Sequence, residues 1–432
     1  MQQDKLRLRT TRSFVAYRGG LKYKKRMVSR REFLLKLARL APLAGAGVVL
    51  CDPFRVLFND GLSLALTEND ELVLSAPKAR YWTSPAQGAQ SCLKCHGRGV
   101  EGMPHEHKSR VVRCLLCAQG CFIGEGERGR CRTRMNVKGE LRSLVYGRPI
   151  AIHVDPIEKK PFYHFLPGSA AYSLATSGCP LRCKFCQNWE MSQAAPEDYR
   201  VERKTAETVA LNAATRRAPV IAFTYNEPTV FTEYLLDIAG EARELGLRSV
   251  LVTCGLMNEA PLADMCRALD AIKVDLKGYS ESFYRNVCGA ELKPVLRSIK
   301  QIARSRVHLE IVNLVVPTLN DSDEMVRDLI TWVMNEVGPD VPLHFTRFHP
   351  NYQLLNLPPT PVATLERARD AAIARGLRYV YVGNVPDHPG NNTRCPHCGK
   401  EVIKRTSFFV TEVHVKGGRC VFCRRKIAGV WG

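Results

Sequence analysis

The sequence predicts an α/β fold with a parallel sheet that forms a full or partial barrel, and two observations support this. From about residue 170, short apolar runs rich in β-branched and aromatic residues alternate with longer amphipathic stretches. Strands that alternate with helices at this spacing form βαβ units, which build parallel sheets. Polar motifs directly follow four of the runs, and in such folds the chemistry lies on loops at the carboxyl ends of strands. A doubly wound open sheet is the main alternative.

Seven apolar runs are the expected strands of this sheet. They cover residues 172–176, 220–225, 249–253, 271–276, 308–316, 343–348 and 379–382. The stretches between them have helical periodicity. In SDEMVRDLITWVMNEVG, for example, the apolar residues that share one helix face are Met325, Leu329, Ile330, Val333 and Met334.

The four polar motifs are expected to meet at one rim of the sheet. Residues 179–186 follow the first strand, and Asn226-Glu227-Pro228 closes the second. Thr253-Cys254-Gly255 ends the third strand, and Asp275-Leu276-Lys277 ends the fourth. Because parallel strands end at the same edge, these four loops predict a single site.

The composition allows a large core, since 45% of the residues are hydrophobic. The net charge of +21 is uneven: residues 1–40 hold 13 Lys and Arg against 2 Asp and Glu. We therefore expect no nucleic-acid partner, because over half of the excess charge lies in one tail. The chain has no apolar run of the roughly 20 residues that an ordinary spanning helix needs.

Residues 1–70 are expected to be a basic tail with an export signal. Ser29 to Lys36 reads SRREFLLK, which resembles a twin-arginine signal, and residues 40–50 are uncharged and about as long as a signal-peptide apolar region. Met27 is a second candidate start. The pattern predicts export or membrane tethering. The alternatives are a basic tail before a short core helix, and a cytoplasmic protein.

Seventeen cysteines are many for this chain, and most lie in close groups that favour metal binding over disulfides. Cys92, Cys95 and His96 form a C-x-x-C-H pattern, the spacing of a c-type haem attachment. Cys92 and Cys95 could instead pair with Cys114 and Cys117 in a zinc ribbon. A third arrangement leaves them out and forms one four-thiolate site, zinc or iron–sulfur, from Cys114, Cys117, Cys121 and Cys131.

The C-terminal residues 391–432 contain two further C-x2-C pairs around the strand-like sequence RTSFFVTEVHV. This resembles a zinc ribbon, although the gap between the pairs is slightly longer than usual. The alternative is a hairpin with reduced, metal-free thiols. The four expected zinc ligands are Cys395, Cys398, Cys420 and Cys423.

Cys179, Cys183 and Cys186 form a C-x3-C-x2-C loop in the sequence CPLRCKFC. Thiolates suit zinc, copper(I) and iron–sulfur clusters, and a structural zinc site is closed by four ligands. Three cysteines on a [4Fe–4S] cluster leave one iron free for another ligand, namely the amino and carboxylate groups of S-adenosylmethionine. The alternative is a zinc site whose fourth ligand is a distant residue: Cys254, Cys266 or Cys288.

This loop, with Phe185 before its last cysteine, resembles the radical S-adenosylmethionine (radical SAM) superfamily. The strings HVDPIEKKPFYHFLPGS, SLATSGCPLRCKFCQNWEMSQ, FTYNEP and PLHFTRFHP are similar to the AmmeMemoRadiSam-system radical enzymes, relatives of pyruvate formate-lyase activating enzymes. The resemblance covers roughly residues 110–432 and so favours the separate four-thiolate site. It implies a partial (β/α)6 TIM-like radical SAM barrel over 151–390, with a Cys-rich module over 71–150 and a zinc-ribbon-like module after it.

The resemblance also implies roles for individual residues. Cys179, Cys183 and Cys186 would bind three irons, and Phe185 would lie near the adenine. Glu227 would accept the methionine amino group, within a turn where Asn226 replaces a glycine of the family. The remaining positions, which touch ribose or carboxylate in relatives, are Thr253, Asp275 and Lys277.

The sequence departs from the family at Val252, and Asp275 and Lys277 have an alternative role. Val252 stands where some relatives have an acidic residue, which weakens the expected ribose contacts. Asp275 and Lys277 could also simply form a buried ion pair at a strand end.

The implied activity is reductive cleavage of S-adenosylmethionine to methionine and a 5′-deoxyadenosyl radical, which abstracts hydrogen from a substrate. The implied partners are an electron donor of the flavodoxin or ferredoxin type and an unidentified small-molecule or protein substrate. One alternative is an activating enzyme that acts on a partner protein. Another is a non-catalytic iron–sulfur or haem electron carrier.

Overall fold

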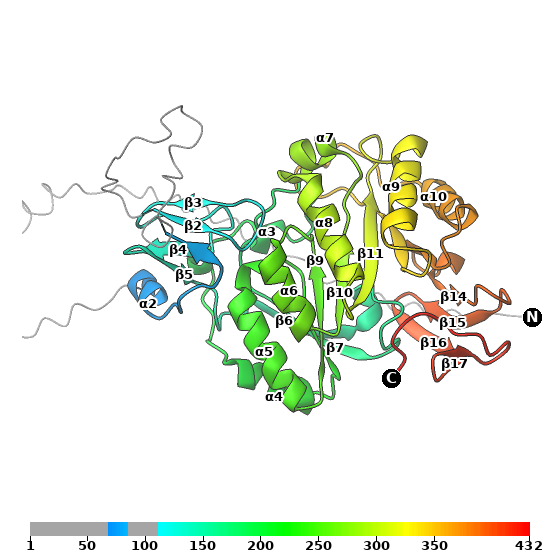
Figure 1. Ribbon diagram of the computed structural model, residues 1–432, viewed down its shortest axis with the longest axis horizontal. Coiled ribbons are helices and arrows are strands. Elements are labelled where there is room, and N and C mark those ends of the chain that lie inside the picture. Colours follow the sequence, from blue (N-terminus) through cyan, green and yellow to red (C-terminus); the bar gives the residue numbers. More distant parts are fainter. Residues whose placement is uncertain (1–67, 85–110) are drawn as a thin grey trace, which may run out of the picture. The chain divides into compact units, whose positions relative to one another are not determined.

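The computed structural model describes residues 68–84 and 111–432 (Figure 1). All described residues belong to one compact unit, which spans Leu66–Gly432. The expected twin-arginine signal and the Cys92, Cys95 and His96 pattern lie outside the described residues. Among the helices that are described, none combines the length and apolar character needed to cross a membrane.

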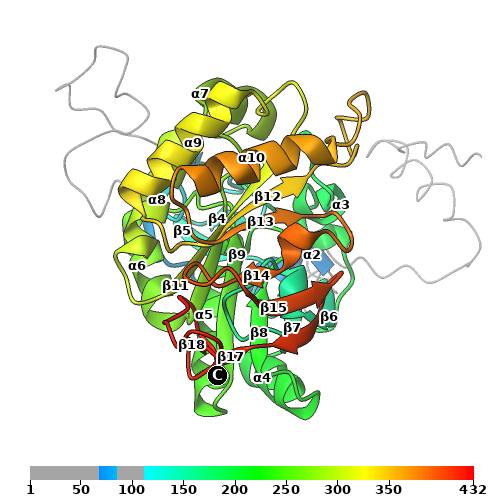
Figure 2. The same cartoon turned by 90° about the vertical axis from the view of Figure 1, so that its right-hand side faces the viewer.

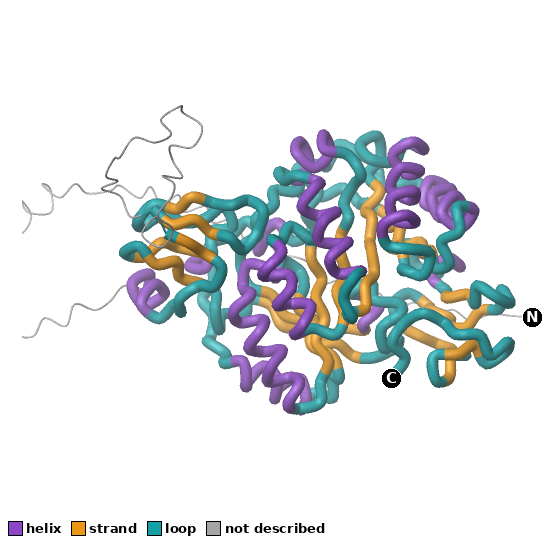
Figure 3. The backbone as a smooth tube through the Cα atoms, viewed as in Figure 1, coloured by secondary structure: helices purple, strands orange, loops and turns teal. Residues whose placement is uncertain are grey.

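An eight-stranded sheet forms the centre of the unit that the structure describes (Figure 3). Seven of its strands are parallel, and the first, β6, pairs antiparallel with β7. In spatial order the strands are β6 (Ala151–Pro156), β7 (Ala170–Ala175), β8 (Val220–Phe223), β9 (Arg248–Thr253), β10 (Ala271–Asp275), β11 (His308–Val315), β12 (Leu343–Arg347) and β13 (Val380–Gly383). The seven expected strands are therefore confirmed, whereas β6 was not expected.

Six main helices connect the seven parallel strands in turn. They are α4 (Ala206–Thr215), α5 (Thr232–Glu244), α6 (Glu259–Ala268), α8 (Leu292–Ala303), α9 (Asp323–Glu336) and α10 (Val362–Ala374). Helices α9 and α10 contact each other, and α10 packs on β12 and β13 (Figure 2). The edge strands β6 and β13 are not hydrogen-bonded to each other. The result is a partial, open (β/α)6 barrel with two additional edge strands, β13 and the antiparallel β6.

The apolar pattern of the sequence explains this arrangement. Every residue of β8 is buried, which is typical of a parallel strand covered on both faces. Helix α8 buries Val295, Ile299 and Ile302 at helical spacing and leaves its charged residues outside. Helix α9 begins at Ser322, whose hydroxyl accepts a hydrogen bond from the backbone N–H of Met325.

The N-terminal elements of this unit are short. They comprise α2 (Glu68–Leu74), a three-stranded sheet of β1 (Trp82–Thr83), β2 (Val112–Cys114) and β3 (Phe122–Ile123), and a hairpin of β4 (Arg134–Val137) and β5 (Glu140–Ser143). A buried ion pair ties them to the barrel. Arg134 donates two hydrogen bonds to the carboxylate of Glu233 on α5, at 2.6 and 2.7 Å.

The C-terminal elements form small antiparallel sheets beside the barrel. The strands are β14 (Thr393–Arg394), β15 (Glu401–Thr406), β16 (Phe409–Val413), β17 (Val415–Lys416) and β18 (Arg419–Cys420). Arg405 on β15 is fully buried, donates to the carbonyl of Tyr163 at 2.8 Å, and lies 3.7 Å from the Glu158 carboxylate. The expected boundaries at residues 70, 150 and 390 stay predictions.

Candidate active site

The three-cysteine loop lies between the end of β7 and the short helix α3 (Trp189–Ser192). Its backbone is held by a π-helical turn, Tyr284–Cys288, that follows β10. Arg182 N–H donates to the Cys288 carbonyl at 2.8 Å, and Lys184 N–H donates to the Val287 carbonyl at 3.0 Å. These bonds hold the middle of the loop, where Cys183 is buried.

The turn after β8 is hydrogen-bonded to both flanks of this loop. The Asn226 amide donates to the Gly178 carbonyl, just before the first cysteine, at 2.9 Å. The Asn188 amide, just after the last cysteine, donates to the Tyr225 carbonyl at 2.7 Å. The structure thus brings the expected Asn226-Glu227 motif and the three thiols into one constellation.

The glycine position of that turn differs from expectation. Tyr225, and not Asn226, has the left-handed φ of 72° that a glycine would adopt easily. The carbonyl of Tyr225 is held by Asn188, and its side chain is held by Asp155 and Lys160. The hydroxyl donates to Asp155 at 2.7 Å, and the Lys160 ammonium lies 4.3 Å from the ring centroid.

Glu227 is buried, and the chain itself surrounds its carboxylate. Thr253 donates its hydroxyl proton to Oε1 at 2.6 Å, and Cys254 N–H donates to Oε2 at 2.7 Å. Thr229 also donates to Oε1, through its hydroxyl and its backbone N–H. Glu227 therefore ties the β8 turn to the end of β9, and Thr253 acts as its partner.

Asp275 lies between two lysines at the end of β10. It accepts hydrogen bonds from Lys273 and from Lys277, the latter at 3.3 Å. Burial acts to raise the pKa of Asp275, but the two ammonium groups outweigh it and hold that pKa below its usual value. Burial acts to lower the pKa of Lys277, yet Asp275 and the Cys183 thiol raise it. The buried ion pair considered from the sequence is present.

Phe185 is buried beside these charges. Its ring stacks on Phe283 with centroids 6.2 Å apart, and the Lys277 ammonium lies 5.7 Å from its centroid. The aromatic residue of the cysteine motif thus forms an apolar wall next to Lys277.

The spacing of the sulfur atoms tests which metal fits the loop. Four thiolates around one zinc ion, at Zn–S of about 2.3 Å, lie about 3.8 Å apart. Cys179, Cys183 and Cys186 do not satisfy this, because no three metal-ligating atoms there lie within 4.8 Å of one another; in the described chain only the C-terminal set does so. A cubane, in which each thiolate binds a different iron, does not require the three sulfurs to lie so close together.

The comparisons with known proteins agree with this geometry. The sequence pattern of the Radical SAM superfamily matches residues 173–332. The chain belongs to the radical SAM superfamily. An uncharacterized protein of Methanocaldococcus jannaschii is 43% identical over 318 residues, which are 73% of this chain and 95% of that protein. The pyruvate formate-lyase-activating enzyme of Clostridium pasteurianum is 25% identical over 162 residues, 37% of this chain and 67% of the enzyme.

Solved structures of radical SAM proteins are similar only in part. A domain of the pyruvate-formate lyase-activating enzyme from Bacteroides vulgatus has a TM-score of 0.35 at 15% identity, covering 38% of this chain and 98% of the domain. Streptococcus suis SuiB bound to its precursor peptide SuiA has a TM-score of 0.40 at 15% identity, covering 54% of this chain and 52% of SuiB. At these values the structural likeness carries no argument for the family.

The match to the Radical SAM superfamily over residues 173–332 makes the chain an enzyme of the radical SAM class. This class uses a [4Fe–4S] cluster and S-adenosylmethionine.

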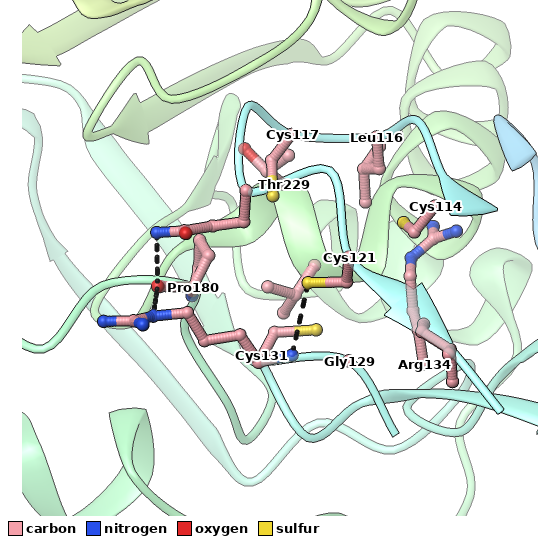
Figure 4. Close-up of a pocket in the computed structure, with 13 residues that line it drawn as sticks. Cys114, Leu116, Cys117, Cys121, Gly129, Cys131, Arg134, Pro180 and Thr229 are labelled. Carbon is pink, nitrogen blue, oxygen red and sulfur yellow. Dashed lines mark hydrogen bonds between the residues drawn. The ribbon is translucent and has the colours of Figure 1, made fainter. Parts of the chain in front are cut away.

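The two other cysteine groups differ in geometry. Cys114, Cys117, Cys121 and Cys131 line one pocket (Figure 4). In the C-terminal set, the Cys395 and Cys423 sulfurs are 3.6 Å apart and the Cys398 and Cys420 sulfurs are 3.9 Å apart. All four C-terminal sulfurs lie within 4.8 Å of one another, as in a structural zinc site.

Sequence reasoning missed several residues around the site. Cys288 was considered only as a distant zinc ligand, but it lies against the loop, and the pKa of its thiol is raised first by its bond to Cys183 and then by burial. Asn188, Asp155 and Lys160 lie within two of the strings that carry the family resemblance, but those strings gave no site role to them. Lys160 donates a hydrogen bond to Asp155 at 2.6 Å. The fold places this pair beside Tyr225, which is 65 residues from Lys160 in the sequence.

Proposed function

We propose that this protein binds a [4Fe–4S] cluster through Cys179, Cys183 and Cys186 and cleaves S-adenosylmethionine reductively. When bound, the cluster would supply one electron to the sulfonium, yielding methionine and a 5′-deoxyadenosyl radical that takes hydrogen from a substrate. One observation carries the proposal: the Tyr225–Pro228 turn is hydrogen-bonded to both ends of the three-thiol loop, through the Asn226 amide and the Tyr225 carbonyl.

The surrounding residues would orient the sulfonium compound and keep water out. Glu227, held by Thr253, would accept the methionine amino group or shape the turn that accepts it. Lys277 would face the methionine carboxylate, since its charge is retained beside Asp275. Phe185 would provide an apolar contact for the adenine. Orientation of this kind is the main contribution a protein makes to cofactor chemistry.

The substrate is unidentified, either a small molecule or a protein; the alternative function is activation of a partner protein at a backbone glycine. The similarity to an activating enzyme from Clostridium pasteurianum supports that alternative over 37% of this chain only. A non-catalytic electron carrier is the second alternative. The Tyr225–Pro228 turn argues against it, because an electron carrier needs no polar turn bonded to an open three-thiolate loop.

Three further expectations remain proposals. We propose structural zinc for the C-terminal four-cysteine site, because its sulfur spacing suits a single ion. We also propose an electron donor of the flavodoxin or ferredoxin type. The third proposal is export or membrane tethering through the twin-arginine pattern. It is tested by locating the full chain in fractionated cells. The changes Arg30→Lys and Arg31→Lys together should abolish the export or tethering.

The activity is tested by anaerobic reconstitution with iron, sulfide, S-adenosylmethionine and dithionite, followed by quantification of 5′-deoxyadenosine. We expect production by the wild type and by Cys266→Ala, a buried cysteine on α6, and at least a hundredfold loss in Cys183→Ala. An unchanged yield in Cys183→Ala would remove this loop as the site of the reaction.

A further inference from the structure

The four N-terminal cysteines share a pocket with mostly apolar walls. Cys114 ends β2, Cys117 and Cys121 lie in the following loop, and Cys131 precedes β4. Figure 4 shows their side chains around one space, and the apolar part of the wall is formed by Leu116, Ile123, Pro180 and Val230. A ligand in this pocket would be shielded from water on several sides.

The sulfur spacing in this pocket does not suit a zinc ion. Within the described residues, no three of these four sulfurs lie within 4.8 Å of one another, in contrast to the C-terminal set. A zinc site needs separations of about 3.8 Å, given Zn–S bonds of about 2.3 Å. An iron–sulfur cluster uses the same four thiolates but spreads them over separate irons.

Two of the sulfurs also accept hydrogen bonds, which tune iron–sulfur clusters. The Arg130 N–H donates to the Cys121 sulfur at 3.5 Å (Figure 4), and the Thr133 hydroxyl donates to the Cys131 sulfur at 3.2 Å. The buried Arg134 adds a positive charge to the wall of the pocket, neutralised in part by Glu233. These groups stabilise negatively charged sulfur at this position.

The pocket is built directly against the three-cysteine loop. Arg130 Nε and Gln119 Nε2 both donate to the carbonyl of Pro180, the residue after Cys179, at 3.0 and 3.2 Å (Figure 4). Gly178, the residue before Cys179, is packed so closely that a Cβ there would lie 2.5 Å from the Cys131 carbonyl oxygen. The backbones that carry Cys131 and Cys179 are therefore in van der Waals contact.

We propose that Cys114, Cys117, Cys121 and Cys131 hold a second iron–sulfur cluster, which accepts electrons from a low-potential one-electron donor and passes them to the three-cysteine loop. One electron moves at each step, the donor is oxidised by one electron, and no bond forms or breaks. Four thiolates leave no open iron, so this cluster does not bind S-adenosylmethionine. The electron-passing part rests on the proposed function; the presence of the cluster does not.

The cluster is tested in the full-length chain, produced anaerobically, with Cys179, Cys183 and Cys186 all changed to Ala. We expect this variant to keep about four irons and four sulfides per chain, and to show an electron paramagnetic resonance (EPR) signal after dithionite reduction that S-adenosylmethionine does not alter. Further changes, Cys114→Ser and Cys121→Ser, should remove the iron. A variant with zinc in place of iron, or iron that survives the added changes, would overturn the cluster.

Two controls keep the test decisive if the multiple variant folds poorly. Mössbauer quantification of the wild type should give about eight irons per chain in two clusters, and Cys266→Ala should leave that number unchanged. A wild type with only one cluster would contradict the proposal. Electron passage is measured separately in Cys114→Ser/Cys121→Ser: reduction of the remaining cluster by reduced flavodoxin should slow at least tenfold, while the response of its spectrum to S-adenosylmethionine persists. Equal rates would overturn the electron-passing part.

Discussion

The two four-cysteine regions of this protein are anchored alike but differ in the spacing of their sulfur atoms. Each is attached to the barrel through a buried Arg–Glu pair, Arg134 with Glu233 and Arg405 with Glu158. The C-terminal sulfurs lie within 4.8 Å of one another, whereas no three of the N-terminal sulfurs do. Pairs of C-x2-C spacing therefore do not distinguish a zinc ion from a cluster. The three-dimensional separation of the sulfurs does.

The largest expected effect comes from removing the C-terminal metal. Cys398→Ala takes away one of four zinc ligands, and structural zinc contributes about 10 kcal/mol or more in small zinc modules. We expect loss of zinc and rapid proteolysis within residues 391–432, while the iron content stays the same. Metal analysis with limited proteolysis checks this. A parallel loss of iron would show that the two regions are not independent.

The Arg134–Glu233 pair should be the most sensitive anchor of the N-terminal region. Its two side chains are 1% and 6% exposed, so Glu233→Gln leaves a buried cation without its counterion and should cost about 3–5 kcal/mol. The matched control is Asp340→Asn, which breaks an exposed pair with Arg378 and should cost under about 1 kcal/mol. Urea unfolding measures both, and equal small effects would contradict the buried anchor.

Gly178 tests the contact between the N-terminal pocket and the three-cysteine loop. Its φ is +89°, and an added Cβ would lie 2.3 Å from the Thr133 methyl and 2.5 Å from the Cys131 carbonyl oxygen. Gly178→Ala should therefore cost about 2–4 kcal/mol, from the strained φ and from overpacking. It should also lower the occupancy of both iron sites.

Gly126→Ala is the matched control for this change. Gly126 has a similar φ of +77°, but an added Cβ meets nothing within 4 Å, so only the cost of about 1 kcal/mol for the backbone is expected. Iron content should not change in this variant. Equal stability and equal iron loss in the two variants would argue against a close contact at Gly178.

The smallest expected effect is a pH dependence of stability that arises from His164, which contacts the C-terminal residue Ala428. Burial lowers the pKa of His164 to about 3, despite the attraction of Glu310. The His164 ring contacts the Ala428 carbonyl and the Tyr381 hydroxyl. The unfolded chain binds a proton near pH 6.5 and the folded chain does not, so stability is present above that pH and falls as the pH decreases.

The expected loss from His164 is about 2 kcal/mol between pH 7 and pH 5. Urea unfolding at the two pH values measures it. The glutamine in the variant His164→Gln cannot take up the proton. The variant should therefore lose about 2 kcal/mol less unfolding free energy than the wild type between pH 7 and pH 5, whatever its stability at pH 7. The same slope in both proteins would assign the pH dependence to other groups.

The sequence predicted the parallel sheet well, because its strands carry strong local signals. Runs such as VIAF in β8 are apolar throughout, and the seven expected strands agree with the structure to within a few residues. β6 was not expected because its sequence, AIHVDP, mixes polar and apolar residues at an edge of the sheet. Edge strands lack the continuous apolar pattern that marks central ones.

The site was predictable only where residues share a short motif. The three thiols, Glu227 and Asp275 each stand in a loop after a strand, so their common rim followed from the topology. Tyr225 in the left-handed φ region, the bond from Asn188, and Cys288 beside Cys183 depend on segments far apart in the sequence. Sulfur separation is also a property of the folded chain, which is why the sequence alone left zinc and cluster open.

The central claim is that the three-cysteine loop holds a cluster with one iron open to S-adenosylmethionine. The most direct test is the EPR spectrum of anaerobic, dithionite-reduced Cys114→Ser/Cys121→Ser, in which that cluster alone should contribute. The account predicts a signal that changes when S-adenosylmethionine is added and disappears when Cys183→Ala is added to the two serine changes. A spectrum that is identical with and without S-adenosylmethionine would contradict it.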